Sequence, residues 1–156
     1  PNLFHDPRSG KFFLTFYRGN DHDDFNLVSK SASTIEGLAG APERLLMHTS
    51  TTVAAPTLLY VPNAGPEGRG LYYLATEIYP GRYSKDGSGW QVKVFYSDRP
   101  DGKFLPVADN PVQSGDRACM FQFIFDGKFY GYQSHLDART DKWEMEVVTA
   151  PLPRGR

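Results

Sequence analysis

Short apolar runs separated by polar turns recur along this chain in the same order three times. The most regular run opens with glycine and aromatic residues, at 10–14, 70–74 and 127–132. A shorter apolar run precedes each of these, at 2–5, 56–60 and 120–125. Further runs follow each of them after a polar loop, at 25–29, 90–94 and 143–147, and the first two repeats add a fourth, at 44–47 and 103–107. The pattern predicts three modules of four antiparallel strands, of which the third stops before its fourth strand.

The predicted strands are apolar on both faces. Successive side chains of a strand point to opposite sides, so in residues 12–17 the face that carries Phe12, Leu14 and Phe16 backs onto a face that is also largely apolar. A strand of this kind is covered on both sides. Four-stranded sheets that recur every ~40–60 residues and cover one another are typical of propeller blades. We therefore predict an all-β fold of about three four-stranded antiparallel β-propeller blades, with a β-sandwich or jelly roll as the alternative.

The repeats also predict where the elements and the core lie. Residues 1–156 are expected to form a single β-propeller-like domain, with blades at about 1–53, 54–115 and 116–156. Almost no helix is expected, and strands are expected near residues 2–6, 11–18, 25–32, 43–48, 56–61, 70–78, 90–98, 103–107, 119–126, 128–135 and 142–149. The side chains expected to be buried between blades are Phe13, Leu14, Phe16, Leu58, Tyr72, Leu74, Val92, Val94, Phe121, Phe123, Tyr130 and Val147.

Composition and charge narrow the classes of function. Aromatic residues make up 14% of the chain, which favours strands because aromatic side chains fit a pleated, half-buried surface. The formal net charge is −1 and no stripe of lysine and arginine occurs, so nucleic acid is not expected as a partner. No apolar run approaches the ~20 residues that span a bilayer, so a membrane is not expected either. Cys119 is the only cysteine, which excludes an intrachain disulfide framework and predicts a small core residue rather than a nucleophile.

One end of the modules is the expected place for a site. Antiparallel strands bring the start of each first strand and the loop between the second and third strands to the same end. Paired carboxylates there can run glycoside hydrolysis, one as the acid and the other as base or nucleophile. The catalytic candidates by position are Asp116, Glu77 and Asp21, and the substrate-binding candidates are Arg18, Arg117, Gln122 and His135. The alternative is that these are solvated loop charges, surface ion pairs and a structural histidine.

Neither a cofactor nor a metal is predicted. The run Asp21-His22-Asp23-Asp24 carries oxygen and imidazole donors but has no regular ligand spacing, so a polar turn is the better interpretation. The glycine-rich run 65–70 precedes a predicted strand, so no helix N-terminus is available there to hold a phosphate.

Three stretches carry a resemblance to a known family: Ala55-Pro56-Thr57-Leu58, Leu71-Tyr72-Tyr73-Leu74 and the run from Val92 to Phe104. They resemble the five-bladed propellers of glycoside hydrolase family 43 and its relatives in the family 32 and 68 clan. In such enzymes the catalytic carboxylates sit at the starts of the innermost strands, commonly just before a proline-like position. The matching positions here hold Ala55 and Ala118, and Asp116 is the nearest carboxylate at the expected end.

The resemblance implies a carbohydrate-active protein that hydrolyses glycosidic bonds with paired carboxylates and has carbohydrate as its partner. It also implies a soluble protein that is secreted or periplasmic. The alternative is a non-catalytic propeller segment that binds carbohydrate or protein. A run of three blades leaves an apolar face uncovered at each end, and such faces usually have a partner. The sequence therefore predicts either a homo-oligomer, in which two copies complete a six-bladed ring, or a chain excised from a longer one.

Overall fold

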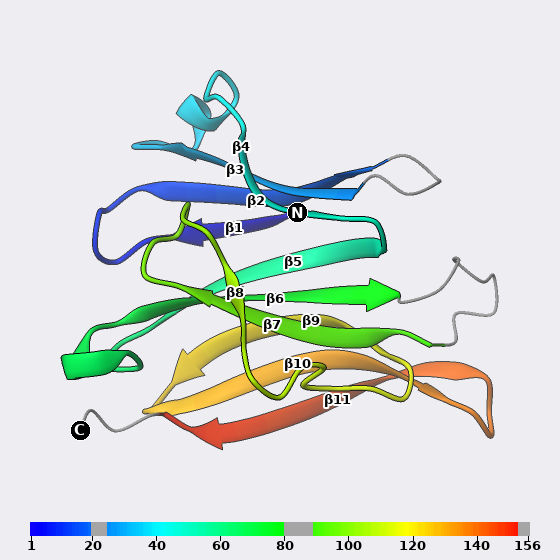
Figure 1. Cartoon of the computed structure of the whole chain (residues 1–156). Helices are drawn as coiled ribbons and strands as arrows, with labels where there is room; N and C mark the ends of the chain where they lie inside the picture. Colours follow the sequence, from blue (N-terminus) through cyan, green and yellow to red (C-terminus); the bar gives the residue numbers. More distant parts are fainter. Residues whose placement is uncertain (20–24, 80–88, 153–156) are drawn as a thin grey trace.

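Three antiparallel β-sheets lie one beside the next in the computed structural model, which describes residues 1–19, 25–79 and 89–152 (Figure 1). The first sheet has the order β1-β2-β3-β4, with bounds Asn2–His5, Phe12–Gly19, Phe25–Ala32 and Arg44–Thr49. The second has the order β5-β6-β7-β8, with bounds Thr52–Val61, Leu71–Tyr79, Gln91–Ser97 and Leu105–Pro106. The third has the order β9-β10-β11, with bounds Arg117–Phe125, Lys128–Asp137 and Lys142–Pro151.

The helical content of the described residues is small. It consists of two short 3-10 helices, η1 at Glu36–Leu38 and η2 at Pro66–Gly68. Within these same residues, no helix has the length and apolar character needed to cross a membrane.

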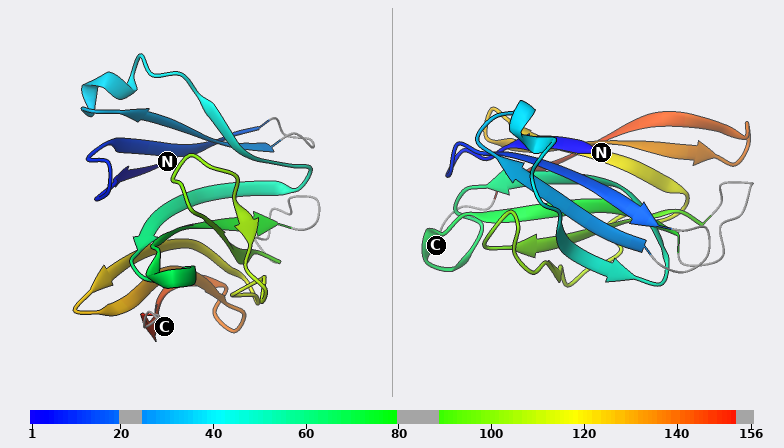
Figure 2. Two further views of the ribbon diagram at one scale, coloured as in Figure 1. Left: turned by 60° about the vertical axis from the view of Figure 1, so that its left-hand side comes forward. Right: turned by 90° about the horizontal axis from the view of Figure 1, so that it is seen from above.

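The first strands of successive sheets are neighbours, so the sheets stack face to face. β5 contacts β1 on one side and β9 on the other, and the remaining strands of each sheet extend outward from this line (Figure 1, Figure 2). Sheets stacked in this way cover one another's apolar faces, as the blades of a propeller do. The second sheet is therefore covered on both faces, whereas the first and third sheets each have one covered face.

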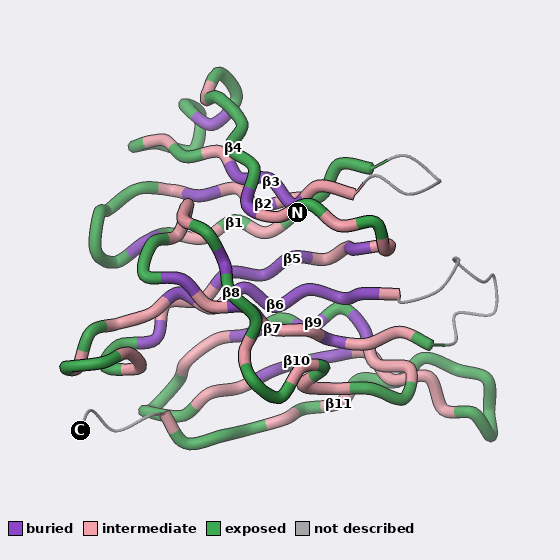
Figure 3. The backbone as a smooth tube through the Cα atoms, viewed as in Figure 1, coloured by how far each residue is buried: buried purple, intermediate pink, exposed green. Residues whose placement is uncertain are grey.

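Buried residues concentrate in the second sheet and where its neighbours face it (Figure 3). The larger core cluster joins the first and second sheets and consists of Phe13, Leu27, Leu46, Val53, Leu58, Tyr72, Leu74, Ile78, Phe95 and Phe104. The smaller cluster joins the second and third sheets and consists of Ala75, Val92 and Met120. Because apolar burial is the main favourable contribution to folding, these two layers hold the stack together.

Polar side chains also cross between the first and second sheets. The Oδ1 atom of Asn2 accepts the backbone N–H of Leu58 at 3.0 Å, and the Tyr72 hydroxyl donates to Oδ1 of Asp6 at 2.7 Å. Both bonds lie in or beside the buried layer, where an unpaired polar group is costly. They therefore fix how the two sheets are placed relative to each other.

The strands predicted from the repeats are confirmed. All eleven are present in the predicted order, and the third sheet lacks a fourth strand among the described residues. The main differences are at two boundaries. β5 begins at Thr52 rather than near residue 56, because its first residues still pair with β6, and β8 is reduced to two residues.

Burial follows the prediction except on the third sheet. Five of the expected core residues are buried, namely Phe13, Leu58, Tyr72, Leu74 and Val92, and five are half-buried, namely Leu14, Phe16, Val94, Phe123 and Tyr130. The prediction is wrong for Phe121 and Val147, which are 53% and 50% exposed. Their side chains project from the face of the third sheet that is turned away from the second sheet.

Candidate functional site

The starts of β5 and β9 carry the same backbone irregularity. In each, two residues lie opposite a single residue of the next strand: Ala55 and Pro56 between the Ala54–Glu77 and Thr57–Ala75 pairs, and Cys119 and Met120 between the Ala118–Ser134 and Phe121–Tyr132 pairs. The first residue of each of these β-bulges has a positive φ, 44° at Ala55 and 53° at Cys119. Such conformations are unfavourable for residues other than glycine and concentrate at functional sites.

The bulges correct the alignment of the repeats. Counted from the last paired residue, the position equivalent to Ala55 is Cys119. The family resemblance in the sequence had matched Ala118 to Ala55. Each bulge begins directly after a paired alanine, so Ala118 is the equivalent of Ala54 rather than of Ala55. Neither Ala55 nor Cys119 is a carboxylate, so these two strand starts do not carry one at this position.

Glu77 connects the two bulged sheets. It lies near the end of β6 and is buried, and its Oε2 atom accepts the backbone N–H of Cys119 at 2.8 Å and the Cys119 thiol at 3.1 Å. Burial of the thiol, together with the adjacent Glu77 carboxylate, raises the pKa of Cys119 to about 12. The thiol is therefore protonated at neutral pH and acts as a donor to Glu77 rather than as a nucleophile. Cys119 is exposed as a residue, so the prediction that it is a core residue is wrong.

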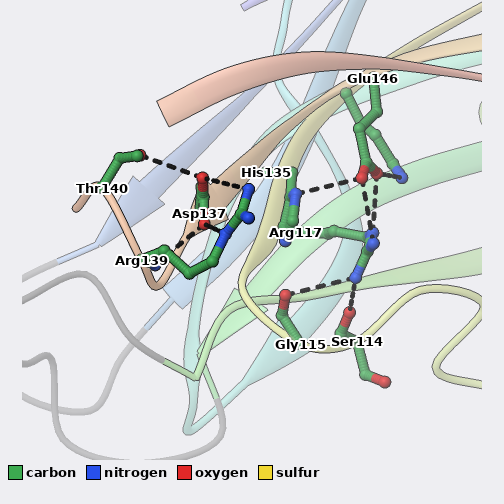
Figure 4. A network of polar contacts seen from close by, with 9 residues as sticks. Ser114, Gly115, Arg117, His135, Asp137, Arg139, Thr140 and Glu146 are labelled. Carbon is green, nitrogen blue, oxygen red and sulfur yellow. Dashed lines mark hydrogen bonds and ion pairs between the residues drawn. The ribbon is translucent and has the colours of Figure 1, made fainter. Parts of the chain in front are cut away.

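A polar network occupies the same end of the third sheet (Figure 4). Arg117 donates from Nε and Nη2 to the two carboxylate oxygens of Glu146, at 2.8 and 3.1 Å. His135 Nδ1 lies 3.1 Å from Glu146 Oε1, and Gln133 Nε2 donates to Glu146 Oε2 at 3.2 Å. The hydrogen bond from Arg117 is the main cause that lowers the pKa of Glu146 below its ordinary value. This carboxylate is therefore ionised at neutral pH and holds Arg117 and His135 in place.

Asp116 and Arg117 also tie the third sheet to the second. The Asp116 carboxylate accepts the backbone N–H of Gly89, and the backbone N–H of Arg117 donates to the carbonyl of Trp90 at 3.3 Å. Arg117 Nη1 donates to the carbonyl of Ser114 at 2.8 Å. The segment that leads into β9 is thus held against the start of β7.

Four of the predicted site residues lie at this end of the second and third sheets, namely Glu77, Asp116, Arg117 and His135. Two others lie elsewhere. Arg18 forms an ion pair with Glu43 on the outer side of the first sheet, which raises the pKa of Arg18. Gln122 is buried in the middle of β9, where its Nε2 donates to the carbonyls of Thr57 at 2.9 Å and Tyr73 at 3.0 Å. Asp21 lies outside the described residues.

Sequence reasoning did not identify Glu146, which is the centre of the polar network. Nothing in the 143–147 run marks it, because Glu146 and Glu144 both occupy the polar positions that alternate with Trp143, Met145 and Val147. In the described residues, no group of three or more histidine, cysteine, aspartate or glutamate side chains could hold a metal ion.

Comparison with protein-family models and with curated proteins found no match. Solved structures do match. The chain superposes on the α-L-arabinofuranosidase from Lactobacillus brevis with a TM-score of 0.67 and 16% identity, covering 99% of this chain and 49% of that one. It superposes on the α-L-arabinanase of Cellvibrio cellulosa, solved with arabinohexaose, with a TM-score of 0.66 and 14% identity, covering 96% of this chain and 52% of that one. It superposes on an exo-1,5-α-L-arabinanase from a bovine ruminal metagenomic library with a TM-score of 0.63 and 15% identity, covering 96% of this chain and 51% of that one.

The chain has the fold of these hydrolases. The predicted all-β propeller architecture, and its likeness to the propellers of glycoside hydrolases, are thereby confirmed. The chain spans about half the length of the solved structures that it matches.

Proposed function

We propose that this chain is a carbohydrate-active propeller that binds arabinose- or xylose-containing polysaccharides at the end of the second and third sheets. The observation that carries the proposal is the gathering of Glu77, Asp116, Arg117 and His135 beside the two bulged strand starts. Carboxylates, guanidinium groups and imidazoles form the directional hydrogen bonds that fix sugar hydroxyls. The fold adds support, since structural neighbours are named as arabinofuranosidase, arabinanases and a xylanase.

The catalytic form of the proposal assigns hydrolysis to paired carboxylates, with Glu77, Asp116 and Asp21 as the candidates. Two carboxyl groups about 5–9.5 Å apart are what either stereochemical course of glycoside hydrolysis needs. The Oε2 atom of Glu77 already accepts the backbone N–H and the thiol of Cys119, so this carboxylate is held in a fixed position beside the start of β9.

A second candidate function is carbohydrate or protein binding without catalysis. Two observations favour it: the bulge positions hold Ala55 and Cys119, and Glu77 and Asp116 each already accept a backbone N–H. In both versions we propose that residues 1–156 act as one domain with blades at about 1–53, 54–115 and 116–156, because buried contacts join each sheet to the next.

The test is to measure the binding and the hydrolysis of arabino- and xylo-oligosaccharides by the same protein. Arg117→Ala and His135→Ala should each weaken binding, by about tenfold where one charge-assisted bond to the sugar is lost. Arg139→Ala is the matched control, because this arginine is almost fully exposed and pairs only with Asp137 in the described network. Thermal melting of each variant separates lost binding from lost folding.

Hydrolysis distinguishes the two versions. If the chain is catalytic, Glu77→Gln should abolish the release of reducing sugar while leaving most of the binding, since the amide keeps the shape of the side chain. Binding without any release of reducing sugar would favour the second candidate. If the folded protein binds none of these oligosaccharides, the carbohydrate proposal fails in both versions.

A further inference from the structure

Hydrogen-bond donors surround Glu146. Arg117 donates to both carboxylate oxygens, from Nε at 2.8 Å and from Nη2 at 3.1 Å. Gln133 turns its amide nitrogen to Oε2 of Glu146 at 3.2 Å, although this leaves its own buried Oε1 atom without a hydrogen-bond partner among the described residues. The bond from Arg117 is the main cause that lowers the pKa of Glu146. Glu146 is therefore ionised at neutral pH and can only accept hydrogen bonds.

The His135 ring contacts this carboxylate through one of its two nitrogens. Its Nδ1 atom lies 3.1 Å from Oε1 of Glu146 (Figure 4). A group that only accepts requires a hydrogen on the nitrogen that faces it, so Nδ1 carries the hydrogen when the ring is neutral. The other nitrogen, Nε2, is then an acceptor. It has no hydrogen-bond partner among the described residues and is not closed off from solvent, so it is open to a ligand.

The charged groups at this end of the sheets favour a neutral ligand for His135. The carboxylates of Glu77, Asp116 and Glu146 all lie here, and they repel a ligand that itself carries a carboxylate. Arg117 does not offset them, because it already makes two hydrogen bonds to Glu146 and two to backbone carbonyls. Neither edge of its guanidinium group keeps the two parallel N–H groups that bind a carboxylate. A hydroxyl group, which is neutral and can donate, suits the free Nε2 atom better.

We propose that Glu146 fixes His135 in the tautomer with its hydrogen on Nδ1, so that Nε2 accepts a hydroxyl of a neutral sugar and the site disfavours uronic acids. His135 is then a binding residue, and Glu146 is a positioning residue that acts through it. The ligand named here rests on the proposed function, whereas the tautomer is a property of the protein without ligand. The two parts can therefore be tested separately.

Nitrogen-15 NMR of the imidazole rings tests the tautomer without any sugar. The measurement is made at about pH 8.5, roughly two units above the ordinary pKa of imidazole, where the chemical shift shows which ring nitrogen carries the hydrogen. We expect the form with hydrogen on Nδ1 at His135, whose signals are identified by their loss in His135→Gln. His5 is the internal reference, because its ring lies 4.7 Å from that of Phe12, centroid to centroid, and has no hydrogen-bond partner among the described residues. It should show the form with hydrogen on Nε2, which unconstrained imidazoles prefer.

Two alanine variants test whether Glu146 sets the tautomer. Glu146→Ala removes the acceptor of Nδ1, so His135 should move toward the form with hydrogen on Nε2. Glu144→Ala is the matched control, because Glu144 lies on the same strand and directly opposite His135 in the register, yet the ion pair of His135 is with Glu146. It should leave the tautomer unchanged, and thermal melting shows whether each variant is folded. A wild-type His135 with its hydrogen on Nε2, or a tautomer that responds to Glu144→Ala and not to Glu146→Ala, would overturn the positioning role.

Titration of the same NMR signals with sugars tests the ligand. Methyl xyloside should bind and shift the His135 signals, and methyl glucuronide should bind more weakly, by on the order of tenfold, because its carboxylate is repelled. Methyl glucuronamide is the matched control, since it has the size of the acid without its charge, and it should bind better than the acid. Equal binding of the glucuronide and the xyloside, or equal exclusion of the acid and the amide, would overturn the selection against uronic acids.

The two tests also separate this inference from the proposed function. If no sugar binds while His135 carries its hydrogen on Nδ1, the carbohydrate proposal fails together with the ligand named here, and the positioning role of Glu146 stands. If sugars bind while His135 carries its hydrogen on Nε2, the carbohydrate proposal stands and the role assigned to Glu146 is wrong.

Discussion

The Tyr72 hydroxyl makes one of the bonds that join the first and second sheets, and its removal tests how those sheets are held. It donates to Oδ1 of Asp6 at 2.7 Å, and both residues are almost completely buried. Asp6 also accepts the Ser9 hydroxyl at 2.6 Å and the backbone N–H groups of Arg8 and Ser9, each at 3.2 Å. Burial raises the pKa of Tyr72, so the phenol stays protonated and remains a donor.

We expect Tyr72→Phe to lower the free energy of unfolding by about 2 kcal/mol at pH 7. A hydrogen bond to a charged group contributes about 1.5–3 kcal/mol, and the three remaining donors keep Asp6 partly compensated. The phenylalanine ring still fills the site, so no cavity term is added. Equilibrium unfolding in urea measures the loss, and for a chain of this size the melting temperature should fall by roughly 4–8 °C. Tyr60→Phe is the control, because this ring packs 5.1 Å from Tyr72, centroid to centroid, and its hydroxyl has no hydrogen-bond partner among the described residues.

The loss should also depend on pH in a defined direction. Burial raises the pKa of Asp6, but the bonds from Ser9, Tyr72 and the backbone outweigh burial and leave the pKa below its ordinary value. A lowered pKa contributes stability above the unfolded value and loses it as the pH falls, so the difference between wild type and variant should shrink below about pH 4. A loss under about 0.5 kcal/mol at pH 7, or one that is equally large in acid, would refute this account of the Asp6 site.

Two further substitutions test the packing. A Cβ at Gly70 would lie 2.0 Å from the Tyr60 hydroxyl, so Gly70→Ala should lower the free energy of unfolding by about 1–3 kcal/mol, measured by thermal melting. Adding Tyr60→Leu should recover part of this loss. If Gly70→Ala loses no stability, the Tyr60 ring moves freely. Gln122→Leu should lower the free energy of unfolding by about 2 kcal/mol, because it leaves the carbonyls of Thr57 and Tyr73 without this donor. It should leave oligosaccharide binding unchanged. Normal stability with lost binding would instead make Gln122 a sugar ligand.

The strands could be predicted from the sequence because local signals specify them. Apolar residues alternate over short runs, and glycine, proline and polar turns separate those runs, so the order of all eleven strands follows from residues close together in the chain. Burial is different, because it depends on what lies across each face. The sequence around Phe121 is as apolar as that around Phe13, but only Phe13 faces another sheet of the chain.

The site was harder to predict because its contacts join distant residues. Glu146 lies 29 positions from Arg117, and Glu77 lies 42 positions from Cys119. Nothing in the local sequence of any of these residues specifies its partner. Gln122 was expected at the site because it lies near the start of a first strand, but the strand turns its side chain into the layer between two sheets.

The contacts between the second and third sheets both join these two sheets and position the candidate site. Gln122 ties the middle of β9 to the second sheet, and Glu77 ties the bulge at its start to that sheet. The positive φ of Cys119 is unfavourable in isolation, so the surrounding bonds must hold it, and the bond from its N–H to Glu77 is one of them. A change in how these two sheets pack would therefore move Cys119, Glu77 and Asp116 together. For this reason, packing variants such as Gln122→Leu must be shown to keep the third sheet in place before any effect on sugar binding is assigned to a side chain at the site.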